Sequence, residues 1–303
     1  MRVDIPTIYH YTSKEAFPLV LKSKQLWLTE ATALNDETEI THFTESFERM
    51  ISEGKFEFPE MEPIVRSMLC KIKPERFGIA CFSNERDSLT NWRLYGGDTT
   101  GLSIGFDAIT LCRIHKRPDD RDAYKWIMEM RKANKKSIGG RPSNIVLRDI
   151  PNLFLEHVQY EDYPEQALID KCLSVLPPRA KIDTRVLSVG FHLIRAACTL
   201  KKKSYQVEKE IRLIKNFRDY FQQDHELFDP GFLTENYAHR IVHGSRRLYY
   251  KHDFLVEQVR EVMLGRNCTL EEADVRETLI ELGFPHDLPI SRSEHQYRTT
   301  NHI

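Results

Sequence analysis

Charged side chains alternate in one short segment of the sequence, residues 207–216 (VEKEIRLIKN). If this segment is a strand, Glu208, Glu210 and Arg212 share one face, and successive side chains on that face lie roughly 6.5–7 Å apart. Two carboxylates and a guanidinium could then flank one polar ligand. If the segment is a helix, Glu208 and Arg212 form an i,i+4 surface pair that contributes only tenths of a kcal/mol. Local propensity does not decide between these alternatives.

A second candidate for chemistry is a pair of short apolar segments with a helical pattern between them. Residues 77–83 and 101–107 predict buried strands. The helix between them carries Leu89, Trp92 and Tyr95 on one face and ends at two glycines. The polar residues around this unit are Ser83, Arg86, Asp87, Arg93 and Asp98. A hydrophobic core with solvated charges explains the same pattern, so the composition alone does not make it a site.

The N-terminal elements would position a histidine. Residues 7–12 (TIYHYT) are rich in β-branched and aromatic residues and predict a strand that carries His10. A helix to about Lys24 and a strand over residues 25–30 follow. A histidine in a strand is more often a structural residue than a catalyst, so His10 needs support from its neighbours.

Short strand signals, widely separated and with helices between them, predict an α+β fold with a bent or split mixed β-sheet. The chain, residues 1–303, is expected to be a single domain. Residues 123–203 are expected to form a largely helical insertion or lid within it. Near the end of this insertion, the run Lys201-Lys202-Lys203 is more typical of a solvated helix end, where the helix dipole favours cations, than of a phosphate site.

Composition limits the function classes. The chain has 44 basic and 45 acidic side chains among 303 residues, which argues against a nucleic-acid footprint over the whole surface. Its six cysteines include no CxxC pair, which is typical of reduced thiols rather than a disulfide framework or a zinc site. No apolar run is long enough to span a membrane, and no signal peptide is evident. We therefore expect a cytoplasmic protein with no membrane partner and no metal.

Four stretches of the sequence together carry a family resemblance. They are YHYTS at residues 9–13, LWLTEATALNDETEI at 26–40, CFSNERDSLTNWRLYGGDTTGLSIGFD at 81–107 and EKEIRLI at 208–214. In this order and spacing they resemble the uncharacterised bacterial domain-of-unknown-function family 2971. The stretch VREVMLGRN and the helix after it resemble the closing strand and helix of that family. The resemblance covers nearly the whole chain, and the family has no agreed activity.

More distantly, the order of these stretches resembles an ADP-ribosyltransferase-like fold. This resemblance implies that His10 binds the nicotinamide ribose of NAD and that Tyr95 or Trp92 stacks on the nicotinamide. It also implies that Glu210 is the catalytic acid, with Glu208 as a competitor for that role. A carboxylate near the ribose can stabilise the oxocarbenium-like charge that forms when the glycosidic bond breaks. A neutral histidine offers one donor and one acceptor to a ribose diol, and a flat aromatic ring can hold the leaving group.

The same resemblance implies a set of residues that contact the nucleotide. These are Tyr11, Thr12, Ser83, Trp92 and Arg212. Arg212 would lower the pKa of a neighbouring carboxylate, which suits a group that stabilises charge and equally suits a structural ion pair.

The sequence supports three function classes. The first is an enzyme with NAD as substrate that transfers ADP-ribose to an acceptor protein or nucleic acid, or that hydrolyses NAD. The second is a non-catalytic module that binds a nucleotide-like small molecule or a nucleic-acid end. The third is a Mg²⁺-dependent hydrolase or nuclease with Asp36, Glu39, Asp87 and Glu210 as oxygen ligands. The spacing of these four acidic residues does not favour the third class.

Overall fold

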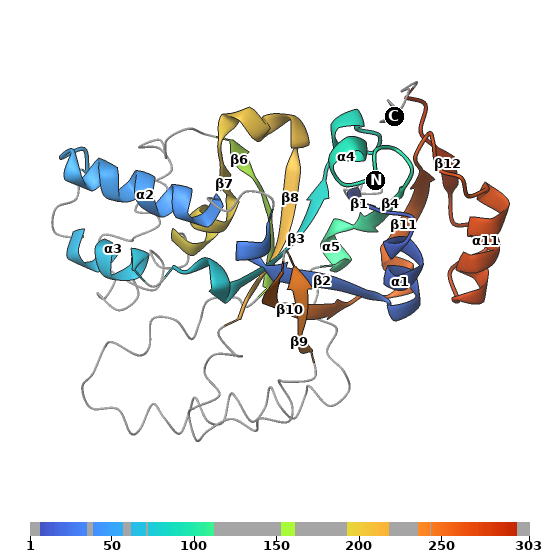
Figure 1. Cartoon of the computed structure of the whole chain (residues 1–303), viewed down its shortest axis with the longest axis horizontal. Helices are drawn as coiled ribbons and strands as arrows, with labels where there is room; N and C mark the ends of the chain where they lie inside the picture. Colours follow the sequence, from blue (N-terminus) through green and yellow to red (C-terminus); the bar gives the residue numbers. More distant parts are fainter. Residues whose placement is uncertain are drawn as a thin grey trace, which may run out of the picture.

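The computed structural model of the chain is a mixed β-sheet flanked by helices (Figure 1). It describes residues 7–34, 39–56, 62–70, 72–111, 153–160, 193–217, 236–242 and 244–295. Within these residues, the helices are α1 Ala16–Ser23, α2 Glu39–Ser52, α3 Glu62–Leu69, α4 Leu89–Leu94, α5 Ala108–Leu111 and α11 Glu272–Glu281, and residues 193–199 are also helical. The 3₁₀ turns are η1 Ala31–Ala33, η2 Pro74–Arg76, η4 Lys203–Glu208 and η5 Val256–Gln258.

Ten strands of the described chain form the main sheet. They are β1 Thr7–Thr12, β2 Gln25–Glu30, β3 Phe77–Ser83, β4 Leu102–Asp107, β5 Leu153–His157, β8 Glu210–Asn216, β9 Tyr237–Val242, β10 Ser245–Asp253, β11 Val259–Leu264 and β12 Ile290–Arg292. Their order is β12-β11-β4-β1-β3-β2-β10-β9, and β8 pairs with β3 and β5 beside this path. The β11–β12 pair is parallel and the others are antiparallel, so the sheet is mixed, and it does not close on itself. The expected α+β class with a mixed sheet is therefore confirmed.

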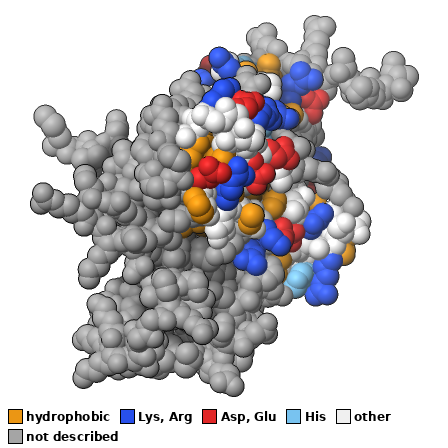
Figure 2. All heavy atoms as spheres, turned by 90° about the vertical axis from the view of Figure 1, so that its left-hand side faces the viewer, with side chains coloured by type: hydrophobic (Ala, Val, Ile, Leu, Met, Phe, Trp, Pro, Cys, Tyr) orange, Lys and Arg blue, Asp and Glu red, His pale blue; other side chains and the backbone are white. Residues whose placement is uncertain are grey.

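The helices cover the sheet in two groups (Figure 1). Helices α2 and α3 lie at one end, where Phe43, Phe47 and Val65 form a hydrophobic core with the strands nearby. Helices α1 and α11 lie at the opposite end, and a second core there includes Leu21 and Leu279. On the described part of the face seen in Figure 2, acidic and basic side chains are interspersed, so that part shows no field of one sign.

Helix α4 begins and ends as its sequence dictates. Asp87 and Ser88 could each cap it, and the structure uses Ser88, whose side chain accepts a hydrogen bond from the backbone N–H of Asn91. The helix ends before Gly97, which has a φ of 57°, a conformation that glycine adopts without a steric penalty. Tyr95 lies at this C-terminal end, on the same helix face as Asn91.

Strand β8 settles the choice between strand and helix for the charged segment. It forms ladders with β3 on one side and β5 on the other, and all of its residues are buried. The strand begins at Glu210, so Glu208 is not part of it, in contrast to the strand alternative over residues 207–216. Glu208 ends turn η4, and Lys209 connects the two elements with a left-handed φ of 45°.

Strand β3 shares one of its edges between two partners. Its start pairs with β2 at Ile79, and its end pairs with β1 at Ser83. Between these points the backbone ladder is interrupted, and the His10 side chain reaches the carbonyl oxygen of Cys81 instead. At Cys81, this edge of β3 therefore lies between its ladders with β2 and β1, and the residues of the site gather there.

The expected helical insertion, residues 123–203, lies mostly outside the described residues. Its described parts are residues 153–160 and 193–203, which form β5, the helical residues 193–199 and the small parallel pair of β6 Gln159–Tyr160 and β7 Leu200–Lys201. Strand β5 extends the main sheet rather than covering it. No helix among the described residues is long and apolar enough to cross a membrane.

Candidate functional site

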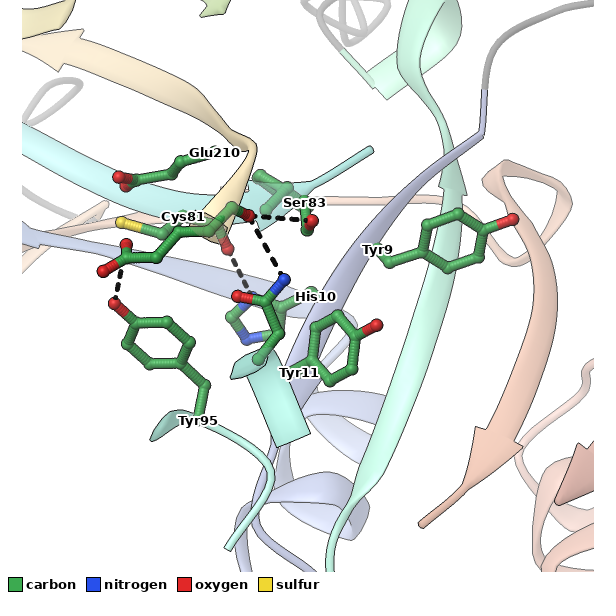
Figure 3. Close-up of a pocket in the computed structure, with 10 residues that line it drawn as sticks. Tyr9, His10, Tyr11, Cys81, Ser83, Tyr95 and Glu210 are labelled. Carbon is green, nitrogen blue, oxygen red and sulfur yellow. Dashed lines mark hydrogen bonds between the residues drawn. The ribbon is translucent and has the colours of Figure 1, made fainter. Parts of the chain in front are cut away.

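A pocket opens where β1, β3, α4 and the start of β8 meet (Figure 3). Its lining residues are Tyr9, His10, Tyr11, Cys81, Phe82, Ser83, Asn91, Tyr95, Glu208 and Glu210. The three residues to which the sequence assigned catalysis, His10, Tyr95 and Glu210, thus line one pocket. Tyr11 and Ser83, expected to bind the nucleotide, line it as well. These residues come from stretches far apart in the chain, which the sheet brings together.

His10 presents a hydrogen-bond acceptor to this pocket. Its Nδ1 lies 3.0 Å from the carbonyl oxygen of Cys81. A carbonyl only accepts, so Nδ1 carries the hydrogen, and in a neutral ring Nε2 is then the acceptor. Burial lowers the pKa of His10, and the hydrogen bond to Cys81 opposes this only in part. The imidazole is therefore neutral at pH 7 and can accept a hydrogen bond from a ligand through Nε2.

Glu210 is held by two cations. Both of its carboxylate oxygens accept hydrogen bonds from Arg212, through Nε at 2.9 Å and a terminal guanidinium nitrogen at 3.0 Å. Lys201 Nζ lies 3.3 Å from Glu210 Oε2. Burial would raise the pKa of Glu210, but the charge and hydrogen bonds of Arg212, together with Lys201, outweigh burial and hold it below the usual range. Glu210 is therefore ionised and committed to an ion pair.

Glu208 keeps one carboxylate oxygen available. Its Oε2 accepts hydrogen bonds from Lys201 Nζ at 3.0 Å and from the Tyr95 hydroxyl at 3.1 Å. Its Oε1 has no hydrogen-bond partner within the described part of the chain. Burial raises the pKa of Glu208, Lys201 lowers it, and the nearby Glu210 charge adds to the rise. Glu208 is thus the carboxylate that can meet a ligand directly.

The turn that carries Glu208 is held from two sides (Figure 3). Its backbone carbonyl oxygen accepts a hydrogen bond from the Ser83 hydroxyl at 3.1 Å and one from Asn91 Nδ2 at 3.2 Å. Ser83 comes from β3 and Asn91 from α4, so both elements fix the position of the carboxylate. In the structure, Ser83 thus positions Glu208.

Three residues expected to bind the nucleotide are not among those that line the pocket. Trp92 is 0% exposed, packs edge-to-face on Tyr11 and donates its indole N–H to Asp87. Thr12 is buried in β1 beside the β4 ladder. Arg212 is buried behind Glu210, where it also donates to the backbone carbonyl of Cys198. In this arrangement, Tyr95 is better placed than Trp92 to contact a ligand.

Several residues that line the pocket or contact its glutamates were not predicted from the sequence, among them Lys201, Asn91 and Cys81. The Lys201–Lys203 run was interpreted as a solvated helix end, and this is wrong for Lys201, which is 3% exposed and contacts both glutamates. Asn91 could have been found, because it precedes Tyr95 by four residues on one helix face. Cys81 could have been found by strand alternation, because it lies on the same face of β3 as Ser83. No local signal marks Lys201 as buried.

The metal hypothesis receives no support from these residues. Asp36 and the side chain of Glu39 lie outside the described residues. Asp87 accepts hydrogen bonds from Trp92 and Ser293, and Glu210 pairs with Arg212. Among the described residues, no group of three or more His, Cys, Asp or Glu side chains is arranged to hold a metal ion.

We expect the Tyr95 hydroxyl to affect the carboxylate more than the fold. Tyr95→Phe removes one hydrogen bond to Glu208 and should lower the free energy of unfolding by only about 0.5–1.5 kcal/mol. It also removes a donor that favours the charged form of Glu208, so the pKa of Glu208 should rise further. Denaturant unfolding and a pH titration of the Glu208 carboxyl by NMR measure the two effects. An unchanged Glu208 titration would show that the hydroxyl does not act on this carboxylate.

One of the comparisons with known proteins gives a match, over part of the chain. Residues 91–213 match the family described as "Protein of unknown function (DUF2971)". The match runs from helix α4 into strand β8, so it includes Tyr95, Lys201 and both glutamates but not His10. No curated protein and no solved structure matches the chain. The match supports the resemblance to family 2971, and the ADP-ribosyltransferase-like resemblance gains no support from it.

Proposed function

We propose that the protein is an NAD-consuming enzyme whose pocket receives the nicotinamide–ribose end of NAD. It would transfer ADP-ribose to an acceptor protein or nucleic acid, or to water. One observation carries this proposal: His10 Nε2 and Glu208 Oε1 are both hydrogen-bond acceptors without a partner in the described chain, and both residues line the same pocket. A ribose diol offers two hydroxyl donors, which matches such a pair of acceptors.

The reaction assigns each residue one task. The bond between the ribose C1′ and the pyridinium nitrogen breaks, its electron pair leaves with neutral nicotinamide, and positive charge develops on the ribose. A carboxylate fixed beside the ribose stabilises that charge as it forms. A hydroxyl of water or of the acceptor then forms the new bond to C1′ and releases a proton. Tyr95 holds the Glu208 carboxylate in place through its hydrogen bond.

The charges within the site favour Glu208 over Glu210 for this contact. Sequence reasoning preferred Glu210, but both oxygens of Glu210 already accept hydrogen bonds from Arg212. Only Glu208 keeps an oxygen that a ribose hydroxyl can reach without breaking an ion pair. Glu210 and Arg212 then form a buried ion pair that stabilises the site without contacting the ribose.

The test is to incubate purified protein with NAD and to measure nicotinamide release, with thermal unfolding as a measure of binding. NAD should raise the melting temperature because a ligand of the native state stabilises it. Glu208→Gln should cut turnover by roughly 10²–10³-fold, because it removes the charge that stabilises the transition state. Glu257→Gln, which changes an exposed glutamate in η5, is the matched control and should leave turnover unchanged. Full turnover in Glu208→Gln, or no release of nicotinamide by wild type, contradicts the proposal.

A second candidate function is a non-catalytic module that binds a nucleotide-like ligand. The observation that favours it is the balance of charge, because Lys201 and Arg212 match the charges of Glu208 and Glu210 within hydrogen-bond distance. Such a cluster can serve structure alone. This function predicts that NAD raises the melting temperature without any release of nicotinamide.

A further inference from the structure

Lys201 is a buried lysine placed between the two glutamates of the site. Its side chain is 4% exposed, and its Nζ lies 3.0 Å from Glu208 Oε2 and 3.3 Å from Glu210 Oε2. It belongs to strand β7, and its ammonium lies 4.6 Å from the centre of the Tyr205 ring. A lysine is rarely buried in this way unless it is paired, so its contacts are the reason that it lies here.

The second cation of the cluster, Arg212, is committed elsewhere. It donates to both oxygens of Glu210 and to the backbone carbonyl of Cys198. Among the interactions found for the described residues, Lys201 is the cation within hydrogen-bond distance of Glu208. The charge state of Glu208 therefore depends on Lys201 more than on Arg212.

We propose that Lys201 is a positioning residue of this site, whose ammonium holds Oε2 of the Glu208 carboxylate and leaves Oε1 as the oxygen that faces a ligand. The catalytic consequence of this inference rests on the proposed function. The effect of Lys201 on the Glu208 carboxylate rests on the contact between them alone. Lys201 does not need to touch the ligand, because it acts through the carboxylate that it holds.

The other groups that face Glu208 do not replace Lys201. Tyr95, at the end of α4, donates one neutral hydrogen bond to it. Glu210 from β8 repels its charge, and Arg212 is bound to Glu210.

Two further groups lie near the glutamates. The Tyr160 hydroxyl, from β6, accepts a hydrogen bond from the backbone N–H of Glu210 at 2.7 Å. Cys81 from β3 contributes a thiol beside Glu210. Without the ammonium, burial and the negative charge of Glu210 would both favour the protonated form of Glu208.

The experiment compares Lys201→Met with Lys202→Met, which alters the neighbouring exposed lysine in the full chain. The first readout is the titration of the Glu208 carboxyl by NMR, with its signal assigned from Glu208→Gln. Lys201→Met should move this titration upward by about 1–3 pH units, because an opposite charge at this distance is lost. Lys202→Met should leave it in place, and Lys201→Arg, which keeps the charge, should restore it.

The second readout is the pH dependence of nicotinamide release. In Lys201→Met, turnover should fall at neutral pH and recover as the pH rises and Glu208 loses its proton. Wild type and Lys202→Met should share one profile at lower pH. The two proposals can be tested separately. If the wild-type protein does not cleave NAD, the proposed function is wrong, but the NMR titration of Glu208 still tests the role of Lys201. An unchanged Glu208 titration in folded Lys201→Met overturns the inference.

A double variant covers the case in which Lys201→Met does not fold. Lys201→Met with Glu208→Gln removes both members of the pair, so no uncompensated carboxylate stays buried at that position. The double variant should therefore melt at a higher temperature than Lys201→Met. If it is no more stable than Lys201→Met, Lys201 does not act through Glu208, and the inference is wrong.

Discussion

Glu210→Gln is expected to lower the free energy of unfolding by about 3–5 kcal/mol, which is the cost of breaking a buried ion pair by removing one partner. The Arg212 side chain is 0% exposed, and two of its nitrogens donate to the Glu210 carboxylate. A neutral amide offers only one acceptor oxygen, and the guanidinium charge would stay buried without compensation. Denaturant unfolding at pH 7 measures this loss.

The matched control is Glu85→Gln, which changes an exposed pair with Lys209 near the same pocket. Exposed ion pairs contribute about 0–1 kcal/mol, so this variant should unfold almost as wild type does. Equal and small losses from both variants would show that the buried pair does not stabilise the fold. The double variant Glu210→Met with Arg212→Met should recover much of the loss, because it leaves no buried charge unpaired.

The loss in Glu210→Gln should also depend on pH. Arg212 and Lys201 overcome the effect of burial and hold the pKa of Glu210 below that of the unfolded chain. The stability that the ionised Glu210 contributes is therefore present above the unfolded pKa of about 4.3 and is lost as the pH falls through the folded pKa. The difference in unfolding free energy between wild type and Glu210→Gln should be largest at neutral pH and should shrink in acid. A difference that is the same at pH 7 and about pH 3 would contradict this assignment.

Local patterns predicted most strands near the site, because those strands are short, apolar and bounded by polar turns. Residues 7–12, 25–30 and 77–83 form strands with the predicted bounds, and the strand predicted over residues 101–107 begins one residue later, at Leu102. The charged segment was ambiguous because its charged residues fit two patterns. Glu208, Glu210 and Arg212 are two residues apart, as on one face of a strand, while Glu208 and Arg212 are four residues apart, as on one face of a helix. Its pairing with β3 and β5 decides the matter, and both partners lie more than fifty residues away in the chain. Such pairing leaves no local trace in the sequence.

The site was predicted only in part, for similar reasons. The family resemblance drew attention to His10, Tyr95 and the glutamate segment, and the fold brings these residues to one pocket. It did not reveal Lys201, because the burial of a lysine depends on the partners it meets after folding. It also did not separate Glu208 from Glu210, because the left-handed Lys209 sets the direction of Glu208, and a lysine at positive φ has no sequence signature.

Trp92 was one of two aromatic residues expected to stack on a ligand, and the structure places it in the core rather than among the residues that line the pocket. The ring lies in a small aromatic core with Tyr9 and Tyr11, and its N–H donates to Asp87 at 2.6 Å. Asp87 also accepts a hydrogen bond from Ser293, near the end of the described chain. A buried indole seeks a hydrogen-bond partner, and Asp87 supplies it away from the pocket.

Trp92→Ala is therefore expected to lower the free energy of unfolding by about 3–5 kcal/mol, the usual loss when a large buried ring is truncated. The cavity would lie beneath Tyr11, whose ring centre is 4.8 Å from that of Trp92, so the pocket wall should loosen as well. Trp27→Ala is the control, because Trp27 is 45% exposed and its loss should be far smaller. Denaturant unfolding measures both variants, and the change in melting temperature with NAD reports on the pocket. If Trp92→Ala unfolds as Trp27→Ala does, the indole is not part of the core that supports the site, and α4 does not depend on it to hold Asn91 and Tyr95 in place.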